Sequence, residues 1–146
     1  MAKTTELLVE KFMETLQPVK EDTEIAEIID TMKNEKTTFL PVVDKNEKLI
    51  GCVFDYNLLR LVRIESAPMA GTVWKDSIDK SEGKKKAKDI MDTKIVTVSP
   101  TDTIDSALRI MDNNDARVLT VADKDGKFIG VLRLRTIFGK LLKESE

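Results

Sequence analysis

The chain has 146 residues, of which 41% are hydrophobic and 34% are charged, a length and a balance that suit one compact domain. Its 24 basic and 26 acidic residues leave a formal charge of -2, so no overall positive field favours nucleic acid or an anionic membrane. The sequence has no histidine and one cysteine, Cys52, which excludes His-based nucleophile pairs and thiolate metal cages. We therefore expect neither an enzyme nor a metalloprotein.

The sequence also has no apolar run near the roughly 18 residues that a membrane helix needs. Its first residues lack the uncharged core of a signal peptide. A lone cysteine suits a reducing compartment. Together these features predict a soluble, cytoplasmic protein.

The first predicted element is an amphipathic helix, which the dipeptide Asp22-Thr23 is expected to cap. Its apolar face is spaced at i, i+3, i+4 and i+7 and consists of Ile25, Ile28, Ile29 and Met32. A strand over residues 39–43 and a second strand ending near Val53 follow, joined by a turn in which Asn46 is expected to take a positive φ. A closing helix comes next, and its apolar residues are Leu58, Leu59, Leu61 and Val62.

The same elements recur at an offset of 79 positions, which carries Met32 onto Met111. The second helix is expected after Thr101-Asp102, the strands over 118–122 and up to Leu132, and the turn at Gly126. The identical pairs are Met32/Met111, Asn34/Asn113, Leu40/Leu119, Val42/Val121, Asp44/Asp123, Lys45/Lys124, Lys48/Lys127, Ile50/Ile129 and Gly51/Gly130. This agreement predicts an internal duplication.

The duplication divides the chain into three parts. We expect a first motif over residues 1–64 and a second motif over residues 87–146, each built as strand, helix, strand, strand, helix. Residues 65–86 differ in composition and are expected to form an insertion whose charged end is a flexible linker.

These residues resemble the tandem cystathionine-β-synthase (CBS) domain pair. The resemblance covers nearly the whole chain and rests on EKFMETLQPV and KDIMDTKIVTVSP, on the FLPVVD and VLTVAD strands, and on the LIGCV and FIGVL strands. It implies an α/β fold of two βαββα CBS motifs related by a pseudo-twofold axis, packed sheet to sheet with flanking helices and with two clefts between the motifs. Family members typically sense adenosine-containing ligands and pair into disc-like dimers.

The resemblance also locates a ligand site. In nucleotide-binding members the third strand runs into a G-h-h-[ST]-x-x-D turn, whose hydroxyl meets phosphate and whose carboxylate binds ribose. Phe54 and Asn57 stand at these two positions in the first motif, so a ribose contact remains while the phosphate contact is lost. Arg133 and Thr136 stand there in the second motif, which weakens ribose recognition and strengthens phosphate attraction. Arg117 precedes a strand where members often hold a basic residue.

The candidate ligand-binding residues are therefore Arg117, Arg133, Arg135, Thr136, Thr97, Thr120, Asn57, Phe54 and Pro41. The three guanidiniums are expected to converge on one cleft, so a phosphate should prefer the second motif. Each residue has an alternative role. Arg133 and Arg135 would instead pair with surface carboxylates, Phe54 would plug the first cleft or face a dimer partner, and Asn57 would cap a helix.

From the resemblance we expect a stand-alone regulatory module that senses AMP, ADP, ATP or S-adenosylmethionine in an inter-motif cleft. It would form a homodimer and relay a conformational or oligomeric change to a regulated protein. The alternative is a degenerate pair that acts only as a dimerisation or scaffold element and binds no ligand.

Overall fold

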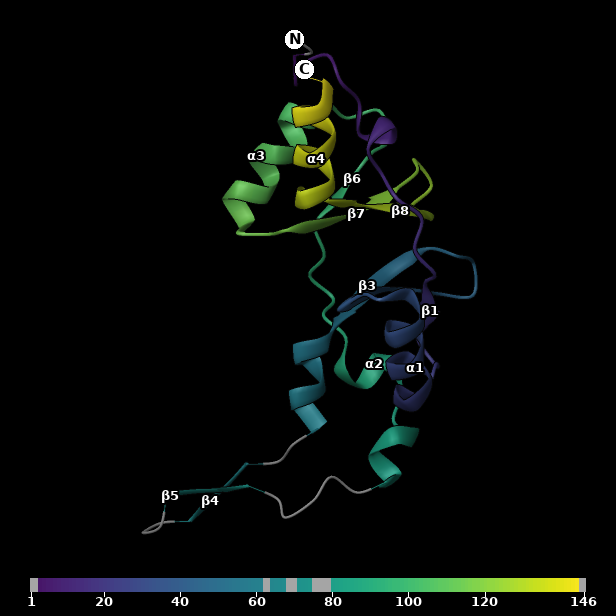
Figure 1. Ribbon diagram of the computed structural model, residues 1–146. Coiled ribbons are helices and arrows are strands. Elements are labelled where there is room, and N and C mark those ends of the chain that lie inside the picture. The colour runs from purple at the N-terminus through teal and green to yellow at the C-terminus, as the bar shows by residue number, and fades with distance from the viewer. Residues whose placement is uncertain (1–2, 62–63, 68–70, 75–79, 145–146) are drawn as a thin grey trace. The chain divides into compact units, whose positions relative to one another are not determined.

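The computed structural model of the protein describes residues 3–61, 64–67, 71–74 and 80–144 (Figure 1). The chain forms two compact units. Unit 1 consists of Met1–Leu16, Lys45–Leu49 and Lys94–Glu146. Unit 2 consists of Gln17–Asp44 and Ile50–Thr93.

Unit 2 contains the first motif. Its three-stranded sheet has the order β1-β2-β3, in which β1 (Val19–Lys20) runs parallel to β2 (Phe39–Val43). Helix α1 (Ile25–Glu35) buries three of the four apolar residues predicted to face the core, namely Ile25, Ile28 and Met32. Strand β3 (Leu49–Phe54) leads into η2 (Asp55–Leu61), which is a 3-10 helix in place of the expected α-helix.

Unit 1 contains the second motif. Its sheet has the order β6-β7-β8 and consists of β6 (Thr97–Val98), β7 (Val118–Ala122) and β8 (Phe128–Arg133). Helices α3 (Ile104–Asn114) and α4 (Leu134–Glu144) lie side by side against one face of this sheet (Figure 1). The buried cluster of this unit consists of Val9, Phe12, Val98, Ile104, Ala107, Met111, Leu119, Val121, Leu132 and Ile137. The predicted α/β repeat is thus confirmed.

The helix ends show how closely the two motifs match. The C-cap of α1, Lys36, has φ 53° and the C-cap of α3, Asp115, has φ 51°, so both helices end on a left-handed residue. The start of α3 differs from our expectation, because Thr103 is the N-cap and accepts a hydrogen bond from the Ser106 amide at 3.1 Å. Asp102 instead accepts from the Ser99 amide at 2.8 Å, which stabilises the preceding turn.

The two hairpin turns are also alike, with one correction to the prediction. Gly126 takes a positive φ of 83°, as expected for the β7–β8 turn. In the β2–β3 turn the residue with positive φ is Glu47 at 66°, and not Asn46. Glu47 is the residue that the repeat aligns with Gly126, so the backbone conformation follows the repeat and not the intrinsic preference of the side chain.

Each unit is completed by the segment that precedes the other motif in the chain. Glu14 forms an antiparallel bridge with Val131, whose amide donates to the Glu14 carbonyl at 2.9 Å. Asp92 forms the same bridge with Cys52, and the Cys52 amide donates to the Asp92 carbonyl at 2.9 Å. Residues 9–16, which we expected in the first motif, therefore belong to unit 1 with the sheet of the second motif, and residues 87–93, which we expected in the second motif, belong to unit 2.

The insertion is more ordered at its charged end than we expected. Strands β4 (Ile64–Ala67) and β5 (Gly71–Trp74) form an antiparallel hairpin, and η3 (Lys80–Lys84) precedes α2 (Ala87–Ile90). The buried Glu82 pairs with Lys85 at 2.9 Å, and the Lys85 carbonyl accepts from the first amide of α1 at 2.8 Å. Residues 80–86 are thus not a featureless linker. Residues 75–79 lie outside the described part, and the boundaries at 65 and 86 stay a prediction.

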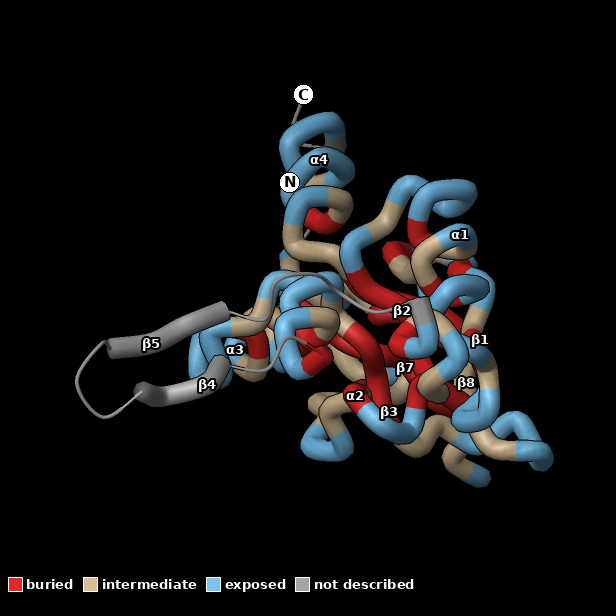
Figure 2. Tube along the Cα trace, turned by 90° about the horizontal axis from the view of Figure 1, so that it is seen from below, coloured by how far each residue is buried: buried red, intermediate tan, exposed pale blue. Residues whose placement is uncertain are grey.

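Burial follows the layers of each unit. Within the part of the chain that Figure 2 colours, β2, β3 and β7 are largely buried and the outer faces of the helices are exposed. The buried apolar residues of unit 2 are Val19, Ile25, Ile28, Met32, Phe39, Leu40, Val42, Val43, Cys52, Val53, Leu61, Ala87 and Ile90. Among the described helices, none has the length and apolar character needed to cross a membrane. The cytoplasmic location stays a prediction.

Candidate functional site

Two of the predicted ligand residues in the second motif contact the carboxylate of Glu14. Arg133 is the last residue of β8, and Thr136 lies in the first turn of α4. The Thr136 hydroxyl donates to Glu14 Oε2 at 2.8 Å, and Arg133 Nη1 lies 3.6 Å from the same oxygen. We call Glu14, Arg133 and Thr136 the Glu14 cluster. It joins an acceptor, a cation and a hydroxyl at the beginning of an 11-residue helix.

The position of Glu14 follows from the backbone. Its amide donates to the Val131 carbonyl at 2.8 Å and its carbonyl accepts from the Val131 amide, so the residue is fixed beside β8 on both sides. Gly130 makes this approach close, because a Cβ there would lie 2.8 Å from the Glu14 carbonyl oxygen. The first turn of α4 contains no acidic residue, so the Glu14 carboxylate supplies the negative charge that a helix N-terminus favours.

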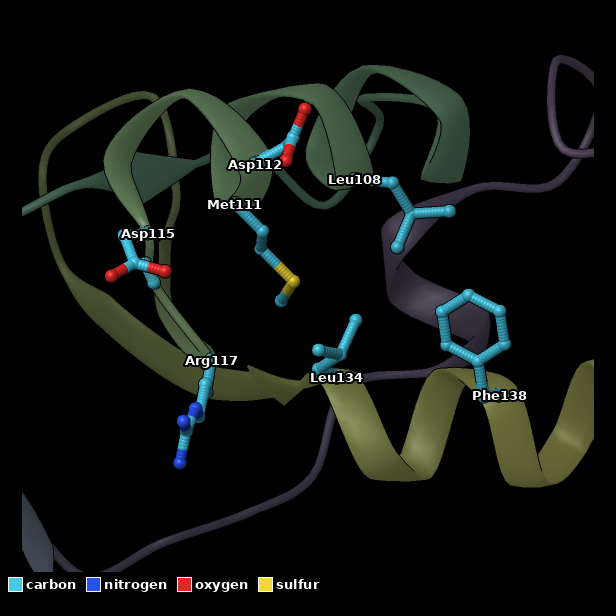
Figure 3. Close-up of a pocket in the computed structure, with 8 residues that line it drawn as sticks. Leu108, Met111, Asp112, Asp115, Arg117, Leu134 and Phe138 are labelled. Atoms are coloured by element: carbon cyan, nitrogen blue, oxygen red, sulfur yellow. The ribbon is translucent and has the colours of Figure 1, made fainter.

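The remaining predicted arginines do not join this cluster. Arg117 lines a pocket between α3 and α4 with a volume of about 360 Å³, and Arg135 is exposed on α4. In the pocket Met111 and Leu134 point toward each other, while the Arg117 side chain extends away from them (Figure 3). The other lining residues are Leu108, Asp112, Asp115, Ala116 and Phe138. The guanidiniums of Arg117, Arg133 and Arg135 thus lie in separate environments and do not converge on one cleft as we expected.

The two predicted threonines contact each other across neighbouring strands. Thr97 of β6 and Thr120 of β7 are register partners, and their hydroxyl oxygens are 2.9 Å apart. The Thr120 hydroxyl also donates to the Val96 carbonyl at 3.1 Å, and Thr120 is buried while Thr97 is exposed. Thr120 therefore acts in strand pairing, and Thr97 is the member of the pair that solvent reaches.

The equivalent positions of the first motif are occupied by Phe54, which lies in a group of aromatic rings, and by the buried Asn57. Phe54 stacks on Tyr56 with ring centroids 5.0 Å apart and is tilted against the buried Phe39 at 5.2 Å. Asn57 is 1% exposed, and its Oδ1 accepts from the Phe54 amide at 2.7 Å. The Asn57 Nδ2 has no hydrogen-bond partner within the described residues. Pro41 lies buried in β2.

Beside this aromatic group lies a second carboxylate. Asp92 Oδ1 pairs with Arg60 Nη2 at 2.5 Å, and Arg60 Nη1 also donates to the Ile90 carbonyl. Burial, with a smaller contribution from the Asp92 charge, raises the pKa of the Cys52 thiol to about 12. Desolvation and the same carboxylate raise the pKa of Tyr56. Cys52 is thus a neutral, unreactive thiol near pH 7.

Sequence reasoning did not identify Glu14 as a candidate. The sequence does contain a signal for this residue, because Met13-Glu14 and Met91-Asp92 are matching dipeptides that precede the first helix of each repeat. The dipeptides lie ahead of the helices from which the repeat is clearest. Among the described residues, no group of three or more His, Cys, Asp and Glu side chains is placed to hold a metal ion.

The duplicated strand-helix-strand-strand-helix unit, with its exchanged leading segments, defines a tandem α/β repeat protein. Within that class the chain belongs to the CBS domain family, whose model matches residues 9–64 and 87–143. The two matches make the chain a tandem CBS pair.

Known relatives agree with this assignment. The CBS domain-containing protein CBSX2, chloroplastic, of Arabidopsis thaliana is 32% identical over 133 residues, which cover 82% of this chain and 56% of the relative. The chain thus spans about half the length of that curated relative. The crystal structure of CBSX2 in complex with AMP has a TM-score of 0.76 at 27% identity and covers 96% of this chain and 99% of that one.

A more distant structure shows the same fold. The CBS domain pair of protein MJ0100, in complex with 5′-methylthioadenosine and S-adenosyl-L-methionine, has a TM-score of 0.69 at 17% identity. The match covers 95% of this chain and 98% of that chain.

Proposed function

We propose that this chain is a regulatory module that binds an adenosyl ligand at the second motif and relays a conformational or oligomeric change to a regulated protein. The observation that carries the proposal is the Glu14 cluster. A guanidinium suits a phosphate or carboxylate of the ligand, and a carboxylate and a hydroxyl suit the hydroxyls of a ribose. The complexes of CBSX2 with AMP and of MJ0100 with S-adenosyl-L-methionine support this class of ligand.

The second motif is preferred over the first because of what occupies the matching positions. Phe54 is held between two other rings, and neither it nor Asn57 brings a charge to the first motif. Arg133 is 32% exposed at its side chain, so a ligand can reach it without unfolding the strand. No catalytic role is proposed for any residue.

The direct test is a melting screen of the full chain with millimolar AMP, ADP, ATP and S-adenosylmethionine. A ligand that binds only the folded state contributes about 2.7 kcal/mol at 100 times its Kd. We therefore expect at least one compound to raise the Tm by several degrees. No shift with any of the four compounds would contradict the proposal.

The scaffold alternative has an observation of its own. Arg133 is already paired with Glu14, and Phe54 is already packed, so both motifs satisfy these positions internally. A chain that binds none of the four compounds and still forms a stable dimer would be a scaffold element.

We also propose a homodimer formed through helix faces. Among the residues whose burial the structure describes, four large apolar side chains are 48% to 66% exposed, and two of them, Leu59 and Phe138, occupy matching positions of the two motifs. The others are Tyr56 and Leu142. Exposed apolar surface on helices favours association with a second copy. Light scattering should report twice the chain mass, and a concentration-independent monomer at micromolar protein would refute the dimer.

The Phe138→Ser variant tests this surface against a matched control. It should shift the mass toward the monomer, because it removes an apolar group from the helix face. Arg109→Ser on α3 is the control, since the Arg109 side chain is 76% exposed and pairs only locally with Asp105. An unchanged dimer in both variants would place the interface elsewhere.

A further inference from the structure

We propose that Glu14 determines the ligand specificity of the second motif, selecting adenosyl ligands of low negative charge over nucleoside di- and triphosphates. The inference rests on the proposed function, because it assigns a ligand class to the same site. It adds a residue that lies outside the motif and that the family pattern at the end of β8 does not include.

The turn after β8 lacks the aspartate of the family pattern. The family pattern places a carboxylate at the position of Thr136, which is a hydroxyl in this chain. The structure places another carboxylate within 2.8 Å of that hydroxyl, since Glu14 Oε2 accepts its hydrogen bond. A carboxylate can accept several hydrogen bonds at once. Glu14 is therefore able to bind ribose hydroxyls from the place where the missing aspartate would act.

The side chains of Glu14 and Arg133 are accessible to a ligand. The side chain of Glu14 is 35% exposed and that of Arg133 is 32% exposed, so the pair is neither buried nor fully solvated. The backbone of Glu14 is held by hydrogen bonds to Val131 in both directions. The backbone of Glu14 is thus fixed beside β8 and its carboxylate is oriented by the Thr136 hydroxyl, so a ligand at this site has to accommodate the carboxylate charge.

The charge of the site comes from the pair of Glu14 and Arg133. Arg133 Nη1 lies 3.6 Å from Glu14 Oε2, so the two formal charges offset each other. A polyphosphate brought to this pair gains attraction from Arg133 and meets repulsion from Glu14. A monophosphate meets less of this repulsion, and a sulfonium ligand brings a positive charge that the carboxylate attracts. The pair thus favours a low charge on the ligand.

The experiment measures the Kd of S-adenosylmethionine, AMP and ATP by calorimetry on the full chain. Glu14→Gln retains an acceptor for Thr136 and removes the charge. Glu10→Gln is the matched control, because Glu10 is an exposed carboxylate of the same segment. We expect Glu14→Gln to lower the ratio of the ATP Kd to the S-adenosylmethionine Kd by about tenfold or more. Glu10→Gln should leave the ratio within a factor of two.

A rescue variant separates specificity from stability. The double variant Glu14→Gln/Thr136→Asp puts a carboxylate at the family position and should restore the preference for S-adenosylmethionine. An unchanged ratio in Glu14→Gln, with ligands still bound, would overturn the role of Glu14 and leave the proposed function standing. No binding by the wild type or by Glu14→Gln would overturn both. Binding of ATP by Glu14→Gln alone would support exclusion by Glu14 and contradict ligand sensing by the wild type.

Discussion

The two units each have a three-stranded sheet and an 11-residue helix, and they differ in the side chains placed at matching positions. In unit 1, Glu14 contacts Thr136 and Arg133, whereas in unit 2 the matching Asp92 pairs with Arg60 and the matching amide of Asn57 keeps an unpaired Nδ2 among the described residues. The side chain of aspartate is one methylene shorter, and Arg60 stands where unit 1 has a glycine. The duplication therefore conserves the fold of the motif, while a few side chains determine what each motif can bind.

The largest expected effect comes from Gly51 of β3 and Gly130 of β8, which the exchanged segments approach closely. An added Cβ would lie 2.7 Å from the Asp92 carbonyl oxygen at Gly51 and 2.8 Å from the Glu14 carbonyl oxygen at Gly130. Gly51→Ala and Gly130→Ala should each destabilise the fold by about 1 to 3 kcal/mol, because the neighbouring backbone has to shift. Urea denaturation measures both changes.

The control for these variants is Gly139→Ala. A Cβ at this position of α4 meets nothing within 4 Å, so alanine should stabilise the helix by about 0.5 to 1 kcal/mol. A loss of stability in all three variants would show that the close approach of the segments is not the cause. A loss only at Gly130 would show that the two units depend unequally on their segments.

The next largest effect is on ligand affinity, and it compares Arg133 of the second motif with Asn57 of the first. Arg133→Ala should weaken any bound adenine nucleotide by at least tenfold, which is about 1.4 kcal/mol, and added salt should weaken binding by the wild type as well. Asn57→Ala should change affinity far less. Arg109→Ala controls for the loss of an exposed arginine. Calorimetric titration decides between the motifs, since loss of binding in Asn57→Ala with intact binding in Arg133→Ala would place the ligand in the first motif.

The smallest effect concerns Cys52, whose counterpart in unit 1 is Val131. The unfolded thiol loses its proton near its ordinary pKa of 9.0, while burial raises the folded pKa to about 12. Its contribution to stability is thus complete below pH 9 and falls as the pH rises toward 12. Cys52→Val should remove a loss on the order of 1 kcal/mol between pH 8 and 10. Equal pH slopes of the unfolding free energy in both proteins would contradict this.

The motif elements were predictable because their signals are local. Strands 39–43 and 118–122 were predicted with the observed bounds, and the helix faces of Ile25 and Ile104 followed from spacing. The exchange of the leading segments was not predictable, because a stretch such as residues 9–16 shows which side chains it can bury and not which sheet it will join. The 3-10 form of η2 was missed since seven residues give little helical periodicity.

The candidate site was predictable only in part. The turn positions of Arg133 and Thr136 could be located from the repeat, and the structure brings these two together. The expected convergence of Arg117 and Arg135 depended on side-chain directions that a one-dimensional pattern does not contain. Glu14 was missed because its partner Val131 is distant in the sequence, and the matching dipeptides Met13-Glu14 and Met91-Asp92 do not show which strand each of them will join.

The exchanged segments also affect the order in which the protein can be completed during synthesis. Val9 and Phe12 leave the ribosome before the strands and helices that bury them. Unit 2 has all of its residues once Thr93 has emerged, while unit 1 has to wait for β8 and α4. The nascent chain therefore carries the unburied Val9 and Phe12 until α4 has emerged, a condition in which chaperones bind and premature association occurs.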